Sequence, residues 1–175
     1  LGMAELHCAC VAKDGNGLLL VGPSRSGKST LSLALSQAGF GLLSDDRTLC
    51  SLRGGTLMAW GTPVLPKLRP EAAAWFPEFR DQKPRDLQNG ELVFRCNPDG
   101  ALRFKRVQMC EPQGILFLEQ KRGSGFELNP MPRAEAAELL AKDLMEEHRE
   151  AVIAQSAIID RLTSLPCWHL QYDAP

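Results

Sequence analysis

The sequence lacks an excess of charge of either sign. Lys and Arg total 20 and Asp and Glu total 21, so the formal net charge is −1 over 175 residues. Binding to nucleic acid or to an anionic membrane surface usually depends on a basic field. We therefore expect neither nucleic acid nor a membrane among the partners of this chain.

Long apolar runs are also missing. No segment approaches the roughly 20 apolar residues that a membrane-spanning helix needs. The first ten residues contain Glu5, His7 and two cysteines, where a secretory signal would have a basic flank and an apolar stretch. These two absences predict a cytoplasmic protein.

None of the six cysteines forms a C-x-x-C pair. Cys8 and Cys10 alternate within an apolar run, which would place both on one face of a strand. Zinc is an alternative ligand for them, but the second half-site is missing. Buried, reduced thiols are the better interpretation. The cysteines are Cys8, Cys10, Cys50, Cys96, Cys110 and Cys167.

The sequence contains no internal repeat, low-complexity tract or clear domain linker. Hydrophobic residues make up 44% of the chain, an ordinary share for a globular domain. A chain of this length can bury a substantial core. We therefore expect residues 1–175 to form a single domain.

What the sequence does contain is a match to G-x-x-x-x-G-K-[ST], the loop that wraps nucleotide phosphates with backbone N–H groups. Its glycines would leave room for the anion and tolerate a positive φ. Lys28 would place its charge on the β- and γ-phosphates, and the Ser29 hydroxyl would help to hold a bridging Mg²⁺. The expected nucleotide-binding residues are Gly22, Pro23, Ser24, Arg25, Ser26, Gly27, Lys28, Ser29 and Thr30.

The segments around this motif have the structural context that it needs. Residues 18–21 read as a strand, and residues 30–38 read as a helix whose N-terminus would point at the phosphates. Upstream, residues 6–12 read as another strand, and Asp14-Gly15-Asn16-Gly17 is a strong hairpin turn. The pattern predicts an antiparallel hairpin that leads into the phosphate loop, and hence a mixed sheet in an α/β domain.

Two carboxylates follow the next expected strand, residues 40–43. Asp45 and Asp46 would lie at a strand end soon after the phosphate loop. Magnesium-dependent phosphoryl transfer needs one group to orient the metal or its waters and another to accept the proton of an attacking hydroxyl. Because adjacent strand residues face opposite ways, we expect the two aspartates to have different roles.

The remainder of the chain predicts further elements. Hairpins are expected over 48–60 and 92–105, strands over 114–119 and 166–172, and helices over 70–76, 133–147 and 149–162. Residues 77–90 read as a polar surface loop. A lid that closes over substrate is the alternative there, and a solvated connection is the better interpretation.

His7, the 22–29 loop and the segment Leu43-Ser44-Asp45-Asp46-Arg47 resemble, in order and approximate spacing, the catalytic domain of bacterial HPr kinase/phosphorylase. Phosphoenolpyruvate carboxykinase shares that P-loop fold. The resemblance implies a mixed-sheet P-loop domain of this type and ATP as the nucleotide. It also implies Asp45 as general base, His7 as its hydrogen-bond partner and Asp46 as a metal or supporting group. A satisfied strand histidine is the structural alternative for His7.

Two residues depart from that family's pattern. Arg25 stands where the family usually has Gly, and Thr30 replaces the acidic residue that commonly follows the loop serine. These departures argue against HPr itself as the acceptor. We therefore expect a kinase that uses ATP and Mg²⁺ to phosphorylate a hydroxyl, most readily serine of a protein or peptide. A nucleotide-binding regulatory module without phosphotransfer and a small-molecule kinase are the alternatives, and homo-oligomer formation stays open.

Overall fold

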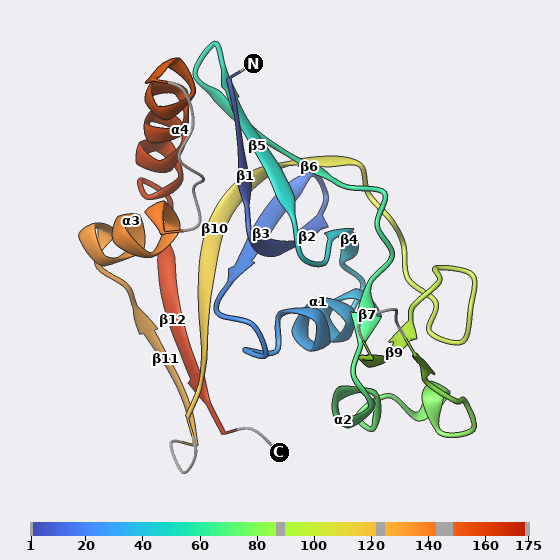
Figure 1. The fold of residues 1–175 in the computed structure, drawn as a ribbon. Coiled ribbons are helices and arrows are strands. Elements are labelled where there is room, and N and C mark those ends of the chain that lie inside the picture. Colours follow the sequence, from blue (N-terminus) through green and yellow to red (C-terminus); the bar gives the residue numbers. More distant parts are fainter. Residues whose placement is uncertain (1, 87–89, 122–124, 143–148, 174–175) are drawn as a thin grey trace.

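The computed structural model describes residues 2–86, 90–121, 125–142 and 149–173. Within these ranges the chain forms one large sheet, helices on both faces of it, and a small second sheet to one side (Figure 1). The large sheet contains both parallel and antiparallel neighbours, so the expected mixed sheet of an α/β domain is confirmed.

The long strand β10 (Met109–Gln120) connects the parts of the large sheet. Its first two residues pair antiparallel with β6 (Thr56–Gly61). Its middle pairs parallel with β3 (Asn16–Val21), and its end pairs parallel with β12 (Cys167–Tyr172). Because β3, β10 and β12 run in the same direction, their carboxyl ends meet at one edge of the sheet.

Antiparallel strands extend the sheet outward from these four. Beyond β6 lie β5 (Thr48–Arg53) and then β1 (Met3–Leu6). Beyond β3 lie β2 (Cys8–Lys13) and then β4 (Gly41–Ser44). β11 (Phe126–Pro130) pairs with the outer side of β12. The expected hairpin over 48–60 is confirmed as β5 and β6.

The turn between β2 and β3 shows why the Asp-Gly sequence forms a tight hairpin. Asp14 has φ 52° and Gly15 has φ 82°, and a two-residue turn with both φ values positive matches the right-handed twist of its strands. β2 and β3 are antiparallel neighbours over their whole length. β3 ends at Val21, directly before the 22–29 loop.

α1 (Lys28–Gln37) follows that loop and covers one face of the large sheet (Figure 1). Its Leu31 and Leu35 pack against a buried cluster that includes Leu20 and Leu118 of the central strands. Alternate residues of a strand face opposite sides, so the neighbouring positions on β3 and β10 point to the other face. The helix expected after the loop is thus confirmed, and it begins at Lys28.

The opposite face of the large sheet is covered by α3 (Arg133–Ala141) and α4 (Arg149–Leu162). Their buried Leu140 and Leu162 belong to the same core cluster as Phe117 of β10. The helix expected over 149–162 is confirmed. Of the helix expected over 133–147, the part to Ala141 is confirmed, and residues 143–148 lie outside the described residues.

A small lobe carries the three-stranded sheet of β7 (Lys67–Leu68), β9 (Leu92–Arg95) and β8 (Arg85–Asp86). The helix expected over 70–76 is shorter in the structure, where α2 (Pro70–Ala73) covers a single turn. The loop expected over 77–90 contains the turn η1 (Pro77–Phe79) and β8, and residues 87–89 lie outside the described residues.

The hairpin expected over 92–105 is wrong. β9 pairs with β7 and β8 instead of with the segment after it. Residues 101–105 form no strand, because Leu102 and Phe104 are drawn into a buried cluster with Leu33 of α1 and Phe94 of β9. Burial of these apolar side chains outweighs the local turn signal at Asn97-Pro98-Asp99-Gly100.

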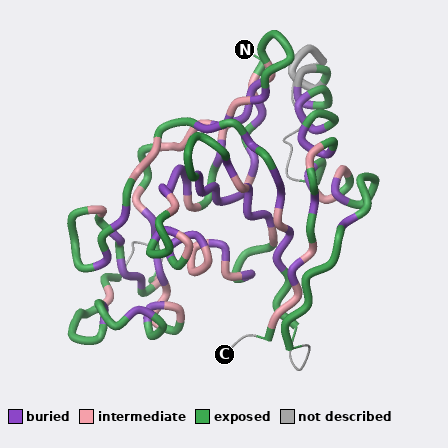
Figure 2. Tube along the Cα trace, turned by 180° about the vertical axis from the view of Figure 1, so that it is seen from behind, coloured by how far each residue is buried: buried purple, intermediate pink, exposed green. Residues whose placement is uncertain are grey.

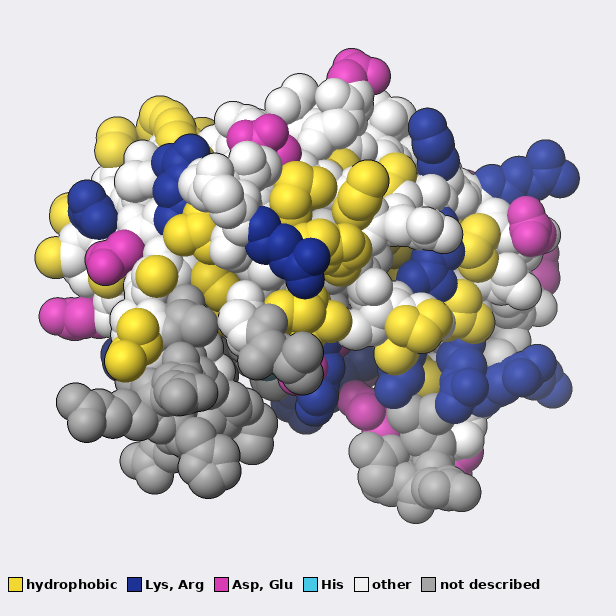
Figure 3. All heavy atoms as spheres, turned by 90° about the horizontal axis from the view of Figure 1, so that it is seen from above, with side chains coloured by type: hydrophobic (Ala, Val, Ile, Leu, Met, Phe, Trp, Pro, Cys, Tyr) yellow, Lys and Arg dark blue, Asp and Glu magenta, His cyan; other side chains and the backbone are white. Residues whose placement is uncertain are grey.

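Buried residues follow the central strands, and exposed residues dominate the small lobe and β11 (Figure 2). All six cysteines are buried thiols that form no disulfide, as expected. Among the described residues, no helix combines the length and apolar character of a membrane span. On the face seen from above, Lys and Arg side chains are interspersed with hydrophobic and acidic ones among the residues described (Figure 3).

Gly61 offers a test of this packing. A Cβ on Gly61 would collide with the Leu43 carbonyl in β4, a backbone atom that has no flexible side chain to move aside. We expect Gly61→Ala to lower the free energy of unfolding by about 1–3 kcal/mol, measured by urea denaturation. Gly114→Ala is the matched control, because a Cβ there would meet only ordinary contacts at 3.4 and 3.7 Å. Equal stability of both variants would contradict the close approach of β6 to β4.

Candidate functional site

The 22–29 loop leaves the carboxyl end of β3 and passes directly into α1. Gly27 is the N-cap of the helix and has φ 83°, a left-handed conformation that glycine adopts without steric cost. The Leu31 N–H donates to the Gly27 carbonyl at 2.8 Å, as the first helical bond. Within the loop the Ser26 N–H donates to the Pro23 carbonyl at 3.1 Å, which already uses one amide expected to face a phosphate.

Lys28 turns its side chain back over this loop. Its ammonium donates to the Gly22 carbonyl at 2.6 Å and to the Pro23 carbonyl at 3.1 Å. The residue is only 6% exposed, so its charge is held close to the loop by these contacts. An anion bound in the loop would compete with the two carbonyls for the same ammonium.

The left-handed residues of the loop differ from those expected. Gly27 has a positive φ, but the second such residue is Arg25, with φ 70°, and not Gly22. A non-glycine residue in this conformation costs about 1–2 kcal/mol. The surrounding loop must therefore hold Arg25 in place. Arg25 is one of the two positions at which the sequence departs from the family pattern that it resembles.

The room beside the two glycines is filled by atoms of the chain itself. A Cβ on Gly27 would meet the Tyr172 hydroxyl, and a Cβ on Gly22 would meet the Ser26 hydroxyl and the Leu118 carbonyl. The sequence-based interpretation assigned this room to the phosphate. In the structure both glycines are needed for packing of the loop against the carboxyl ends of β10 and β12.

Tyr172 is a contact that sequence reasoning missed. Its hydroxyl donates a short hydrogen bond to the Ser26 carbonyl, and it accepts one from Gln120 Nε2 at 3.4 Å. Burial raises the pKa of Tyr172, so the hydroxyl keeps its proton for this bond. The sequence predicted a strand over residues 166–172, but it contained no motif that would assign Tyr172 a contact with the loop.

Asp45 follows β4 and lies next to the start of α1. The Lys67 N–H donates to Asp45 Oδ2 at 3.1 Å. Oδ1 is buried and has no hydrogen-bond partner among the described residues. Burial is the main cause that raises the pKa of Asp45, and the Asp46 charge adds to it, while the Ser29 hydroxyl, the Lys67 N–H and the Lys28 charge oppose the shift.

Asp46 contacts His7, whereas Asp45 accepts from the Lys67 N–H. His7 Nε2 lies 3.0 Å from Asp46 Oδ1, with the two side chains 38% and 63% exposed. The expected hydrogen bond between His7 and Asp45 is therefore wrong. Asp45 and Asp46 lie in a bend after β4, and it is the Asp46 side chain that reaches His7 in the bend between β1 and β2.

The turn that carries both aspartates is fixed at its base by buried hydroxyls. Ser44 and Thr48 flank the turn, and their oxygens lie 2.5 Å apart. The Thr48 hydroxyl also donates to the Cys8 carbonyl at 3.0 Å, next to His7. This network fixes the direction in which the turn presents its two carboxylates.

The described residues offer no cluster of three or more His, Cys, Asp or Glu side chains that could hold a metal ion by themselves. The Ser29 hydroxyl and the Asp45 carboxylate do interact. The Ser29 hydroxyl is an oxygen ligand of the kind that Mg²⁺ accepts beside phosphate and water oxygens, and it can serve in this way while Asp45 accepts a proton. The residues present therefore fit a magnesium ion that arrives with a nucleotide.

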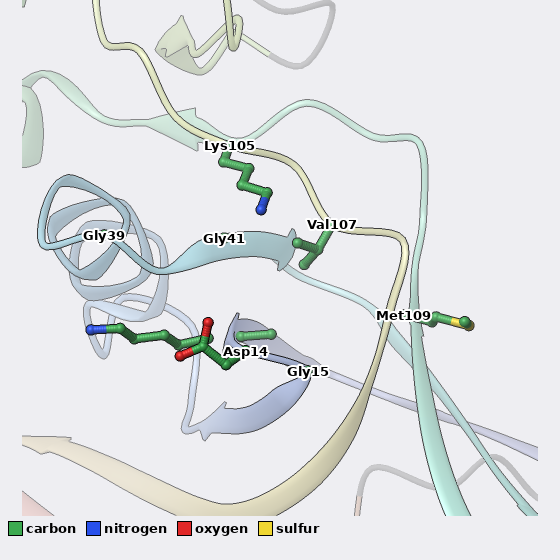
Figure 4. Close-up of a pocket in the computed structure, with 9 residues that line it drawn as sticks. Asp14, Gly15, Gly39, Gly41, Lys105, Val107 and Met109 are labelled. Carbon is green, nitrogen blue, oxygen red and sulfur yellow. The ribbon is translucent and has the colours of Figure 1, made fainter.

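A separate pocket of about 200 Å³ lies at the opposite end of β3 (Figure 4). It surrounds the β2–β3 turn and contains none of the expected site residues. The lining residues are Ala12, Lys13, Asp14, Gly15, Gly39, Gly41, Lys105, Val107 and Met109. The 22–29 loop and Asp45 thus form their site outside this pocket.

No family model matches the chain, and no curated protein matches it. Among solved structures, the chain is similar to the Hpr(Ser) kinase/phosphatase from Coxiella burnetii. The two are 14% identical with a TM-score of 0.45, and the match covers 98% of this chain and 79% of that one. So distant a likeness leaves the chemistry of the site to its own residues.

Proposed function

We propose that the chain is a kinase that uses ATP and Mg²⁺ to phosphorylate a hydroxyl, with serine of a protein or peptide as the acceptor. The observation that carries this proposal is the Asp45 carboxylate, whose buried Oδ1 has no hydrogen-bond partner among the described residues and which interacts with the Ser29 hydroxyl and the Lys28 charge. A buried acceptor atom without a partner is costly, and such atoms concentrate at functional sites.

The residues of the loop would bind the nucleotide. Lys28 would exchange the Gly22 and Pro23 carbonyls for phosphate oxygens, a stronger partner for an ammonium. The N-terminus of α1, which carries the positive end of the helix dipole, favours an anion at the same place. When bound, Mg²⁺ neutralises phosphate charge and orients the nucleotide, and Ser29 is the residue that would hold it.

Asp45 would act as the general base. The acceptor O–H proton would pass to the carboxylate as the new O–P bond forms and the bond from the γ-phosphorus to the bridging oxygen breaks. A raised pKa suits this role, because it makes the carboxylate a better proton acceptor. Asp46 would support the metal or its waters, and His7 would orient Asp46.

A nucleotide-binding regulatory module is the second candidate, and two observations on the loop favour it. The loop satisfies several of its own groups, since Ser26 N–H and the Lys28 ammonium both bond to loop carbonyls. Arg25 also occupies a left-handed position without being glycine. A protein that only senses a nucleotide would need no carboxylate with the burial of Asp45, which is why we prefer the kinase.

Substitution of Lys28 tests the nucleotide site. We expect Lys28→Ala to weaken ATP binding by about 1.5–3 kcal/mol in calorimetry with Mg²⁺ present, because a charge-assisted contact to the phosphates is lost. Lys13→Ala is the matched control, since Lys13 is exposed at the end of β2, beside the hairpin turn and away from the 22–29 loop. Unchanged affinity in Lys28→Ala would exclude the 22–29 loop as a nucleotide site.

Substitutions of Asp45 and Asp46 distinguish the roles of the two carboxylates. Asp45→Asn should retain ATP affinity and reduce phosphate transfer at least about 10²-fold, because the shape is kept and the base is removed. Asp46→Asn should change the Mg²⁺ requirement, and His7→Ala should resemble Asp46→Asn because His7 contacts Asp46. Transfer is measured as phosphate release from ATP and as labelling of lysate proteins by radiolabelled ATP, with mass spectrometry of the labelled species.

Each outcome of these measurements supports a different assignment of the two aspartates or of the function. An active Asp45→Asn with an inactive Asp46→Asn would swap the two roles. If neither substitution affects any phosphoryl transfer, the kinase proposal fails. The regulatory module then replaces it, provided that Lys28→Ala still loses ATP affinity.

The burial of Asp45 also predicts an effect of pH on the stability of the fold. When the pKa of a carboxyl group is higher in the folded than in the unfolded state, the folded protein becomes less stable as pH rises from the unfolded pKa through the folded one. Because burial raises the pKa of Asp45, its charge destabilises the fold at neutral pH. We expect Asp45→Asn to have a higher Tm than wild type at pH 7, and the difference to shrink as pH falls toward 4. A lower Tm at pH 7 would show that the carboxylate is well satisfied.

A further inference from the structure

Two cysteines that lie far apart in the sequence meet in the core of the large sheet. Cys10 Sγ of β2 lies 3.7 Å from Cys110 Sγ at the start of β10, and the two residues are 100 positions apart. Cys10 is 0% exposed and Cys110 is 2% exposed. Both belong to the core cluster to which α3 and α4 contribute. Neither thiol takes part in the proposed phosphoryl chemistry.

A glycine in the strand between β2 and β10 makes this approach possible. Gly17 of β3 pairs with Ala12 of β2, and Ala12 and Cys10 face the same way because they are two positions apart in one strand. Gly17 therefore shares the face of Cys10. A Cβ on Gly17 would lie only 2.5 Å from Cys110 Sγ. The Cys110 thiol thus occupies the space that a side chain at position 17 would fill, and this places it beside Cys10.

The start of β10 can supply the movement that a bond between the two sulfurs needs. The sulfurs would have to close from 3.7 Å to about 2.0 Å. β10 pairs with β6 through Met109 and Cys110, and its register with β3 shifts between Pro112 and Gly114. A short and irregular ladder shifts locally more readily than the regular ladder in the middle of β10.

The contact between the sulfurs also prepares one thiol for reaction. The hydrogen bond from Cys10 lowers the pKa of the Cys110 thiol, although burial opposes this shift. The thiolate is the form of cysteine that reacts with an oxidant. Met109 and Glu111, on both sides of Cys110, are exposed. The Cys110 sulfur therefore lies at the margin of the core, within reach of an oxidant as small as hydrogen peroxide.

We propose that Cys10 and Cys110 form a reversible disulfide when the folded protein meets a peroxide. The Cys110 thiolate attacks hydrogen peroxide and the O–O bond breaks, which gives the sulfenic acid and a hydroxide that takes up a proton to become water. Cys10 then attacks the sulfenic sulfur, the S–O bond breaks, and a second water leaves with the Cys10 proton. Two thiols lose two electrons and two protons in total, and one peroxide is reduced to two waters.

This bond would join the strands on both sides of β3, the strand that leads into the 22–29 loop. A link between residues 100 positions apart restricts the unfolded chain, so the disulfide should stabilise the fold. The contact with Cys110 and burial are the main causes that raise the pKa of Cys10, and the charges of Cys8 and Cys50 add to it. Cys8 and Cys50 are therefore the alternative partners that an experiment has to distinguish.

Peptide mapping of the full chain after treatment with hydrogen peroxide tests the proposal. Trypsin would release Cys8 and Cys10 in residues 1–13 and Cys110 in residues 107–121. We expect the thiols titrated after denaturation to fall from six to four, and the two peptides to be linked until a thiol reductant separates them. The urea midpoint should shift upward and return with the reductant. An oxygen added to Met109 stays in place under the same reductant, so it is told apart from the disulfide.

Variants then locate the bond. Cys10→Ala and Cys110→Ala should each lack the linked peptides, whereas Cys8→Ala should retain them. Cys96→Ala is the matched control and should be oxidised like wild type, because Cys96 is buried in the separate core cluster that includes Leu33 of α1. Circular dichroism checks that every variant is folded.

Three results would overturn the proposal. The first is a folded wild type that keeps all six thiols in excess peroxide. The second is a disulfide of the folded protein that joins Cys50 or any pair of cysteines other than Cys10 and Cys110. The third is loss of the linked peptides in a folded Cys8→Ala, because the bond would then belong to Cys8.

Discussion

The parallel pairing of β10 with β3 on one side and β12 on the other is the constraint on which the rest of the structure depends. It brings the carboxyl ends of three strands, far apart in the sequence, to one edge of the sheet. The 22–29 loop leaves the first of these ends, and Gln120 and Tyr172 stand at the other two. The loop is therefore held by the sheet as well as by the helix that follows it.

The electrostatic arrangement of the site rests on unequal satisfaction of its charges. The Lys28 ammonium has carbonyl partners, whereas Asp45 has one oxygen that accepts from the Lys67 N–H and one that has no hydrogen-bond partner in the part of the chain that the structure describes. The strain of Arg25 and the burial of Asp45 both oppose folding, and the packed sheet must supply the compensating stability. Because the charged Asp45 opposes folding, its replacement by Asn is expected to raise the Tm at pH 7 while it removes the proposed proton acceptor.

Elements with strong local signals could be predicted from the sequence. The Asp14-Gly15 turn defined its hairpin because both residues accept positive φ, and the apolar spacing over 149–162 defined α4. Failures came where distant burial decided the outcome, as at Leu102 and Phe104. The His7–Asp46 pair and the Tyr172 contact were missed for the same reason, because each joins residues that only the folded sheet brings together.

The bond from Tyr172 to the Ser26 carbonyl spans 146 positions of the chain and has a consequence for protein synthesis. Chains leave the ribosome from the N-terminus, so β2, β3 and α1 emerge long before β12. The loop lacks its contact with Tyr172 during most of that time, and β10 also has to emerge before β3 gains its parallel neighbour. An anion that needs the loop held by Tyr172 would bind mainly to chains from which β12 has already emerged, and would stabilise those over shorter nascent chains.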